Sequence, residues 1–209
     1  MADDFHKPTK YSGEWFDRVE AGEDPAAVMR AAHETAHALV DRARASADPD
    51  LIDRLVAYTD RHGIDALAEL WARSNPRTLP GALWRIYLLR LIIRQDPIGT
   101  SLLYQRGTET LRTIDAAVAG APEPTGPDEI TALADQILRG VFKGDFAVAL
   151  DRAAAFSRIL ASGATSLADD AEPIEPGRAT DLTVRADRLT LTAEELDSCA
   201  RLYRRGDLD

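Results

Sequence analysis

The chain has 209 residues, of which 45% are hydrophobic and 29% are charged. These values predict a globular protein of one domain, or of one domain with a tail, and argue against a disordered chain. The formal net charge is -10 and the pI is about 4.9, which disfavours general binding of nucleic acid or of anionic membrane, because both are polyanions. The single cysteine, Cys199, excludes an internal disulfide and a zinc site built from cysteines.

The opening sequence, MADDFHKPTK, is acidic at its start and has no apolar stretch, so it does not match a secretory signal. The most apolar run, residues 83–93, contains Arg85 and Arg90 and is too short and too charged to cross a bilayer. Only three of the 25 basic residues are lysines, and this preference for arginine is typical of a GC-rich bacterial genome. We therefore expect a bacterial, cytoplasmic protein that does not associate with membranes.

Aspartate-proline pairs begin at Asp24, Asp48 and Asp96 in the first half of the chain. In such a pair the aspartate can cap a helix and the proline fits its first turn, so each pair predicts a helix start. No apolar pattern recurs between the pairs, so we expect no structural repeat. Together with the spacing of apolar residues, the pairs predict an extended arm and then four helices, over residues 1–12, 13–21, 25–45, 49–63 and 64–73.

The most apolar predicted helix covers residues 80–95, and we expect it at the centre of the fold. Stretches rich in proline and glycine set the limits of the elements that follow. Thr192 and Glu195 have the spacing of a capping box and predict the start of a last helix that ends near Gly206. The remaining predicted elements are a helix over 97–106, a turn at Gly107, a short helix to 119, a loop over 119–127, helices over 128–139 and 145–162, a mobile linker over 163–181, and a strand or helical turn over 182–191.

No segment has a convincing strand pattern, so these elements predict an all-α fold. We expect a compact domain of about eight to ten helices, with a short helical C-terminal extension. The helical core domain covers residues 1–163, and the loop at 119–127 could subdivide it. Residues 164–191 form a linker or irregular segment, and residues 192–209 form the C-terminal helix.

The stretch AAHETAHALV contains His33, Glu34 and His37 in the order H-E-x-x-H. Histidines four residues apart lie on one face of a helix and can bind one zinc ion. The glutamate at the edge of that face could take a proton from a zinc-bound water. This stretch resembles the active-site helix of the zincin peptidases. The resemblance implies a zinc site with His33 and His37 as ligands and Glu34 as the catalytic base.

Zincins also need a third ligand, and the sequence does not identify one. The extended pattern H-E-x-x-H-x-x-G-x-x-H fails, because Val40 and Ala43 stand where its glycine and third histidine belong. The more distant candidates are Asp60, His62 and Glu69, and none lies in a second motif. No sheet-forming segment precedes the helix, although zincins present their substrate along the edge of a strand.

The same helix also has an ordinary structural explanation. At about 100° per residue its apolar residues form one arc, and His33 and His37 fall at the edge of that arc. Arg30 and Arg44 share the side of the histidines, where they would repel a metal dication. Arg30 also lies one turn before Glu34, as an ion-pair partner. We therefore favour an amphipathic helix without bound metal, and zinc binding is the alternative.

Other reactive residues are better explained by packing. Cys199 lies near apolar residues of the last predicted helix, which is typical of a packed thiol rather than of a nucleophile. Arg85 and Arg90 interrupt the most apolar helix, and we expect them to form partly buried ion pairs with the abundant acids. The sequence contains neither a phosphate-binding glycine loop nor a G-x-S-x-G motif. It therefore supplies no complete catalytic set.

Four segments resemble those of an uncharacterised family of all-helical proteins from actinobacteria. They are FHKPTKYSGEW, VEAGEDP, LPGALWRIYLLR and RGVFKGDFAVALDRAAAF. The resemblance implies a bacterial cytoplasmic protein with an all-helical domain, and it carries over no catalytic residue.

The acidic composition, the many helices and the incomplete catalytic set favour a non-enzymatic protein that acts through protein–protein contacts, for example in regulation. These contacts would be made with an unidentified partner protein or with a second copy in a homodimer, and we expect no cofactor. Phe5, Tyr11 and Trp15 make the N-terminal arm a candidate docking segment. The alternative function is a zinc-dependent, peptidase-like hydrolase that uses the H-E-x-x-H at 33–37.

Overall fold

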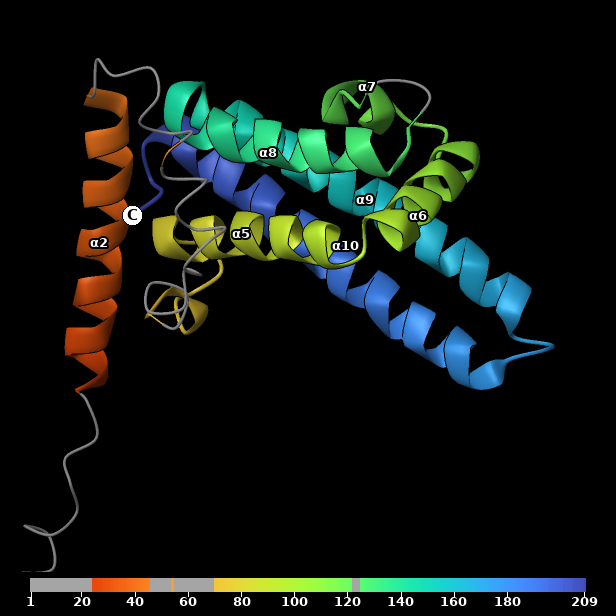
Figure 1. The fold of residues 1–209 in the computed structure, drawn as a ribbon. Coiled ribbons are helices and arrows are strands. Elements are labelled where there is room, and N and C mark those ends of the chain that lie inside the picture. The colour runs from red at the N-terminus through yellow and green to blue at the C-terminus, as the bar shows by residue number, and fades with distance from the viewer. Residues whose placement is uncertain (1–23, 46–53, 55–69, 122–124) are drawn as a thin grey trace, which may run out of the picture.

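The computed structural model describes residues 24–45, 54, 70–121 and 125–209. Within these ranges the chain forms helices and no strand, which confirms the all-α prediction (Figure 1). None of the described helices is both long and apolar enough to cross a membrane. The helices are α2 (Pro25–Ala45), α5 (Leu79–Gln95), α6 (Pro97–Thr110), α7 (Asp115–Ala119), α8 (Pro127–Lys143), α9 (Phe146–Ala171) and α10 (Pro176–Arg205).

Several helix ends follow the predicted capping signals. Asp24 caps α2, because its carboxylate accepts a hydrogen bond from the Ala26 N–H at 3.0 Å. Asp96 caps α6 in the same way, accepting from the Gly99 N–H at 2.8 Å. Gly206 ends α10 with a positive φ of 76°, a conformation that favours glycine. Of the predicted elements, those over 1–12 and 13–21 lie outside the described residues, as does most of 49–63 and of 64–73.

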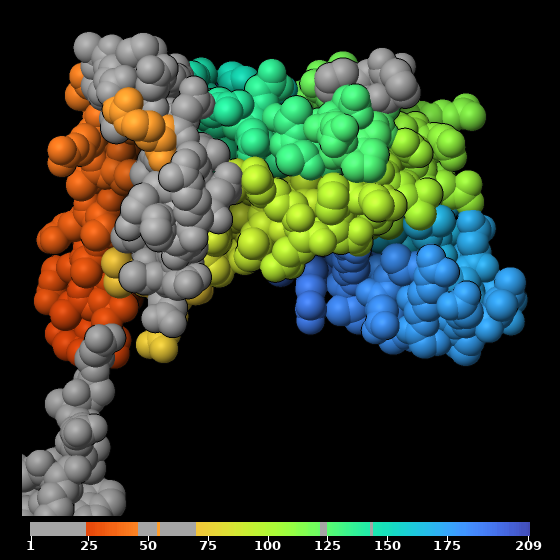
Figure 2. All heavy atoms as spheres, in the orientation of Figure 1, coloured from red at the N-terminus to blue at the C-terminus, as the bar shows by residue number. Residues whose placement is uncertain are grey.

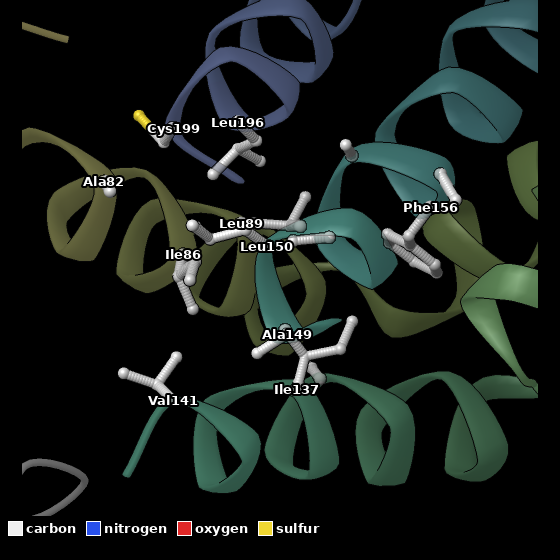
Figure 3. Packing of buried hydrophobic residues seen from close by; sticks show 14 of the residues in the cluster. Ala82, Ile86, Leu89, Ile137, Val141, Ala149, Leu150, Phe156, Leu196 and Cys199 are labelled. Atoms are coloured by element: carbon white, nitrogen blue, oxygen red, sulfur yellow. The ribbon is translucent and has the colours of Figure 1, made fainter. Parts of the chain in front are cut away.

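Two helices lie at the centre of the fold: α5, which covers the predicted 80–95, and α9, which the sequence did not single out. α9 contacts α5, α6, α7, α8 and α10, and α5 contacts α2, α6, α8, α9 and α10. Figure 3 shows buried side chains of α5, α8, α9 and α10 converging on one core. The many alanines of α9 let its neighbours approach closely on several sides, which hydropathy alone does not indicate. The largest fully buried side chains of α9 are Phe146, Leu150, Phe156, Ile159 and Leu160.

Glycines bring the main chains of α6 and α9 into direct contact. A Cβ atom on Gly107 would lie 1.9 Å from the main-chain oxygen of Ile159, and one on Gly163 would lie 1.9 Å from that of Leu103. The helix α6 continues through Gly107 to Thr110, so the predicted turn there is wrong. Glycine is favoured at this position by the close helix crossing and not by a change in chain direction.

An antiparallel hairpin of α9 and α10 forms the C-terminal part of the molecule, and its loop end extends beyond the other helices (Figure 1). The linker predicted over 164–191 is therefore wrong, since α9 continues to Ala171 and α10 begins at Pro176. The predicted helix start at Thr192 is also wrong, because Thr192 lies inside α10 and its hydroxyl donates to the main-chain oxygen of Arg188 at 2.8 Å. The alanines of this region include buried ones in both helices. Their packing stabilises a segment whose composition favours a linker.

Partly buried ion pairs join α5 to its neighbours. Arg85 pairs with Glu195 of α10. Arg90, which is 5% exposed, lies 2.8 Å from Asp135 of α8. Both pairs confirm that the arginines within the most apolar helix serve as partners for acids of the same chain.

Arg158 of α9 connects three helices. It lies 2.7 Å from Asp115 of α7 and 2.7 Å from Asp197 of α10. Burial by itself would raise the pKa of Asp115. Hydrogen bonds from Arg158 and Thr113 and the charge of Arg158 outweigh that effect and hold the pKa below its ordinary value. The carboxylate of Asp115 is therefore stabilised in its ionised form by the fold.

Candidate functional site

The H-E-x-x-H stretch lies on α2, which packs against α5 and α8. Ala32, Ala36 and Val40 are buried on the face of α2 that meets the core. His33 and His37 lie beside that face, with 25% and 45% of their side chains exposed. The structure thus places both histidines at the border of an amphipathic helix.

The last residues of the chain return to α2. After Gly206, Leu208 packs against the core, and the main-chain oxygen of Asp209 accepts a hydrogen bond from the Leu79 N–H at 2.7 Å. The side-chain oxygen Oδ1 of Asp209 lies 3.8 Å from Nδ1 of His33 and 3.5 Å from Nε2 of His37. The two histidines therefore share one carboxylate from the opposite end of the sequence. Sequence reasoning missed Asp209, because no local pattern connects it to α2.

The distant metal ligands proposed from the sequence, Asp60, His62 and Glu69, lie outside the described residues. Among the residues that the structure describes, no group of three or more His, Cys, Asp or Glu side chains is arranged so that it could hold a metal ion. His33, His37 and Asp209 accordingly form a contact between two imidazoles and a carboxylate. A metal shared by these three side chains would require them to move closer together.

The charged neighbours of the motif differ from the predicted ones. Arg30 lies 4.0 Å from Asp24, and Glu34 is exposed, so the predicted Arg30–Glu34 pair is wrong. Arg44 turns to the C-terminal half of the molecule, where it donates to the Tyr203 hydroxyl at 2.7 Å and to main-chain oxygens at the end of α8. Its positive charge therefore compensates the carbonyl end of α8.

Cys199 is packed, as predicted. Its thiol is buried and donates to the main-chain oxygen of Pro76 at 3.3 Å. Burial raises the pKa of the thiol to about 11, so the thiolate needed for nucleophilic attack is disfavoured at neutral pH.

A hollow of about 400 Å³ opens between the segment before α5 and the outer side of α10. Figure 2 shows the hollowed surface below α5, next to α10. Its lining residues are mostly polar, with one arginine and two glutamates, and they also include the apolar Leu191. The residues that line it are Asn75, Pro76, Arg77, Thr78, Leu191, Glu194 and Glu195.

Leu191 also belongs to an exposed strip on the outer face of α10. Val184, two turns earlier on the same face, is 42% exposed, and Leu191 is 55% exposed. The acids of the strip are exposed and form no ion pair with any residue that the structure describes. We name this surface the α10 strip, and it consists of Asp181, Val184, Asp187, Arg188, Leu191 and Glu194.

Comparison of the chain with known protein families, with curated proteins and with solved structures found no match. The seven-residue spacing of Val184 and Leu191 is visible in the sequence. It indicates an exposed strip only when residues 182–191 are known to be helical. The sequence predicted a strand or a helical turn there, within a linker or irregular segment. The two candidate sites are therefore the α10 strip and the contact of His33, His37 and Asp209, which we name the α2 cluster.

Proposed function

We propose that the protein acts by binding another protein, and that this partner docks on the α10 strip and the adjoining hollow. One observation carries the proposal: Val184 and Leu191 expose apolar side chains on a helix whose opposite face is buried in the core. Apolar side chains beside charges without an internal partner are typical of protein-binding surfaces, where a few apolar contacts supply most of the affinity.

The inner face of α10 keeps the strip in place. Leu189 and Leu196 are buried, and Glu195 pairs with Arg85 of α5. A surface that is ordered before binding loses little conformational freedom when the partner docks. Less of the interaction energy is then spent on ordering the surface, so even a small apolar strip can give measurable affinity.

Photo-cross-linking in the native host tests this proposal. A photoreactive amino acid is placed at position 191 or, as a control, at position 114, because Ile114 is 77% exposed and lies outside the strip. We expect a discrete cross-linked protein from position 191 and not from position 114. Adding Val184→Asp to the first variant should remove the cross-link. The absence of a product from position 191, or the same product from both positions, would refute docking at the strip.

A zinc-dependent hydrolase is the second candidate function. The observation that favours it is that α2 is helical through the motif, so His33 and His37 lie one turn apart. Asp209 lies 3.8 Å from His33 and 3.5 Å from His37 and would have to move closer to share a metal with them. Elemental analysis of untagged protein, purified without chelator, is the test. Near-stoichiometric zinc that is lost in both His37→Ala and Asp209→Asn would support the candidate. Protein without metal after zinc is added back would eliminate it.

A further inference from the structure

We infer that the partner segment that docks on the α10 strip is a positively charged amphipathic helix, an inference that rests on the proposed function above. From Asp181 to Glu194 the strip is about 20 Å long at the rise of an α-helix. Its apolar residues, Val184 and Leu191, lie seven residues apart. That is the spacing with which side chains form the contact seam between two packed helices.

The form of the strip selects a helical partner. The main-chain N–H and C=O groups of α10 are bonded within the helix, so an extended peptide would find no strand edge with which to pair. A second helix needs only a seam of side chains. The hollow beside Leu191, at about 400 Å³, has room for one large apolar side chain at the end of the partner's seam.

The charge of the strip selects a cationic partner. Asp181, Asp187 and Glu194 carry three negative charges, and Arg188 carries the opposing one. None of the three acids has an ion-pair partner in the described parts of the chain. The net charge of -10 on the whole chain adds attraction for cations at longer range. Lysine or arginine beside the partner's apolar seam would therefore meet an acid about every two turns of contact.

A second copy of the chain is a poorer occupant. If two strips pack antiparallel about their common midpoint, the apolar residues meet one another and Asp187 meets Arg188. The same arrangement sets Asp181 against Glu194 at both ends of the contact, where like charges repel. Two chains of net charge -10 add to this repulsion. The strip therefore favours a basic helix over itself.

The test uses the full chain and two designed peptides of about 18 residues, long enough to span the strip as a helix. Both peptides carry leucine at the seam positions, with lysine elsewhere in one and glutamate elsewhere in the other. Fluorescence anisotropy at physiological salt measures binding. We expect the lysine peptide to bind and the glutamate peptide not to bind.

Charge variants of the protein test where the lysine peptide binds. Asp187→Asn combined with Glu194→Gln should weaken binding about fivefold, and Leu191→Ala should weaken it about tenfold. The matched control is Asp41→Asn combined with Asp128→Asn, which removes two exposed acids from α2 and α8. This control should change the affinity less than about twofold.

Equal weakening by the two double variants would overturn the inference, because the attraction would then come from net charge and not from the strip. Binding of the glutamate peptide with equal affinity would also overturn it. So would a homodimer in sedimentation of the chain alone that Leu191→Ala dissociates. The cross-link at position 191 separates the two proposals. If that cross-link forms and the charge variants have no specific effect, a partner still docks at the strip but is not a basic helix.

Discussion

The two candidate sites differ in what the fold leaves unsatisfied. On α2, which carries the most recognisable motif of the sequence, His33 and His37 already contact a carboxylate of the same chain. On α10, which carries no motif, Val184 and Leu191 remain exposed beside acids that form no ion pair with a described residue. A sequence motif reports which side chains are present. A binding surface depends on which of them remain without a partner after folding.

The largest expected effect is on the free energy of unfolding, when the same substitution is made on each of the two faces of α10. Leu196 is fully buried, so Leu196→Ala should lower the free energy of unfolding by about 3 kcal/mol. Leu191 is 55% exposed, so Leu191→Ala should lower it by less than about 0.5 kcal/mol. Urea unfolding followed by circular dichroism measures both. A similar cost at the two positions would show that Leu191 is part of the core. The α10 strip would then not be an exposed surface for binding.

The next effect tests the close crossing of α6 and α9. A methyl group in Gly163→Ala would overlap the main-chain oxygen of Leu103, so α6 and α9 must separate, at a cost of about 2 kcal/mol or more. Gly177→Ala in α10 is the matched control, because no atom lies within 4 Å of the added methyl group. There the better helix propensity of alanine should stabilise the protein by about 0.5 kcal/mol. Destabilisation of equal size at both glycines would contradict the close crossing of α6 and α9.

A smaller effect concerns the ion pairs that hold the hairpin to α7. The pKa of Asp115 is lowered from its ordinary value of 3.8, so its ionised form stabilises the fold above that value. The stabilisation is lost as the pH falls through the lower pKa of the folded state. Because Arg158 is 35% exposed, Asp115→Asn should cost about 1 kcal/mol at pH 7 and make unfolding less sensitive to pH below the ordinary carboxyl pKa of 3.8. Denaturant titrations at several pH values measure this difference. An unchanged slope of stability against pH would contradict the role of this pair.

The sequence predicted the helical class, the caps at Asp24 and Asp96, and the ion pairs of Arg85 and Arg90, because each depends on local spacing or on charge within an apolar segment. It failed over 164–191, where glycine, proline and acids favour a linker by composition. There, contacts between the two arms of the α9–α10 hairpin stabilise the helices. Asp209 and the α10 strip were missed for the same reason. Both depend on tertiary placement that a local pattern does not contain.

The smallest expected effect tests the α2 cluster itself. Asp209 has 91% of its side chain exposed, so its contacts with His33 and His37 are screened by water and contribute little to stability. Asp209→Asn should change the Tm by less than about 1 °C, whereas Leu208→Ala removes an apolar contact with the core and should lower the Tm by about 3 °C. Differential scanning calorimetry at neutral pH measures both variants. A larger effect from Asp209→Asn would mean that the two histidines hold the end of the chain through this carboxylate. The α2 cluster would then have a structural function of its own, and the motif would be more than a chance arrangement on an amphipathic helix.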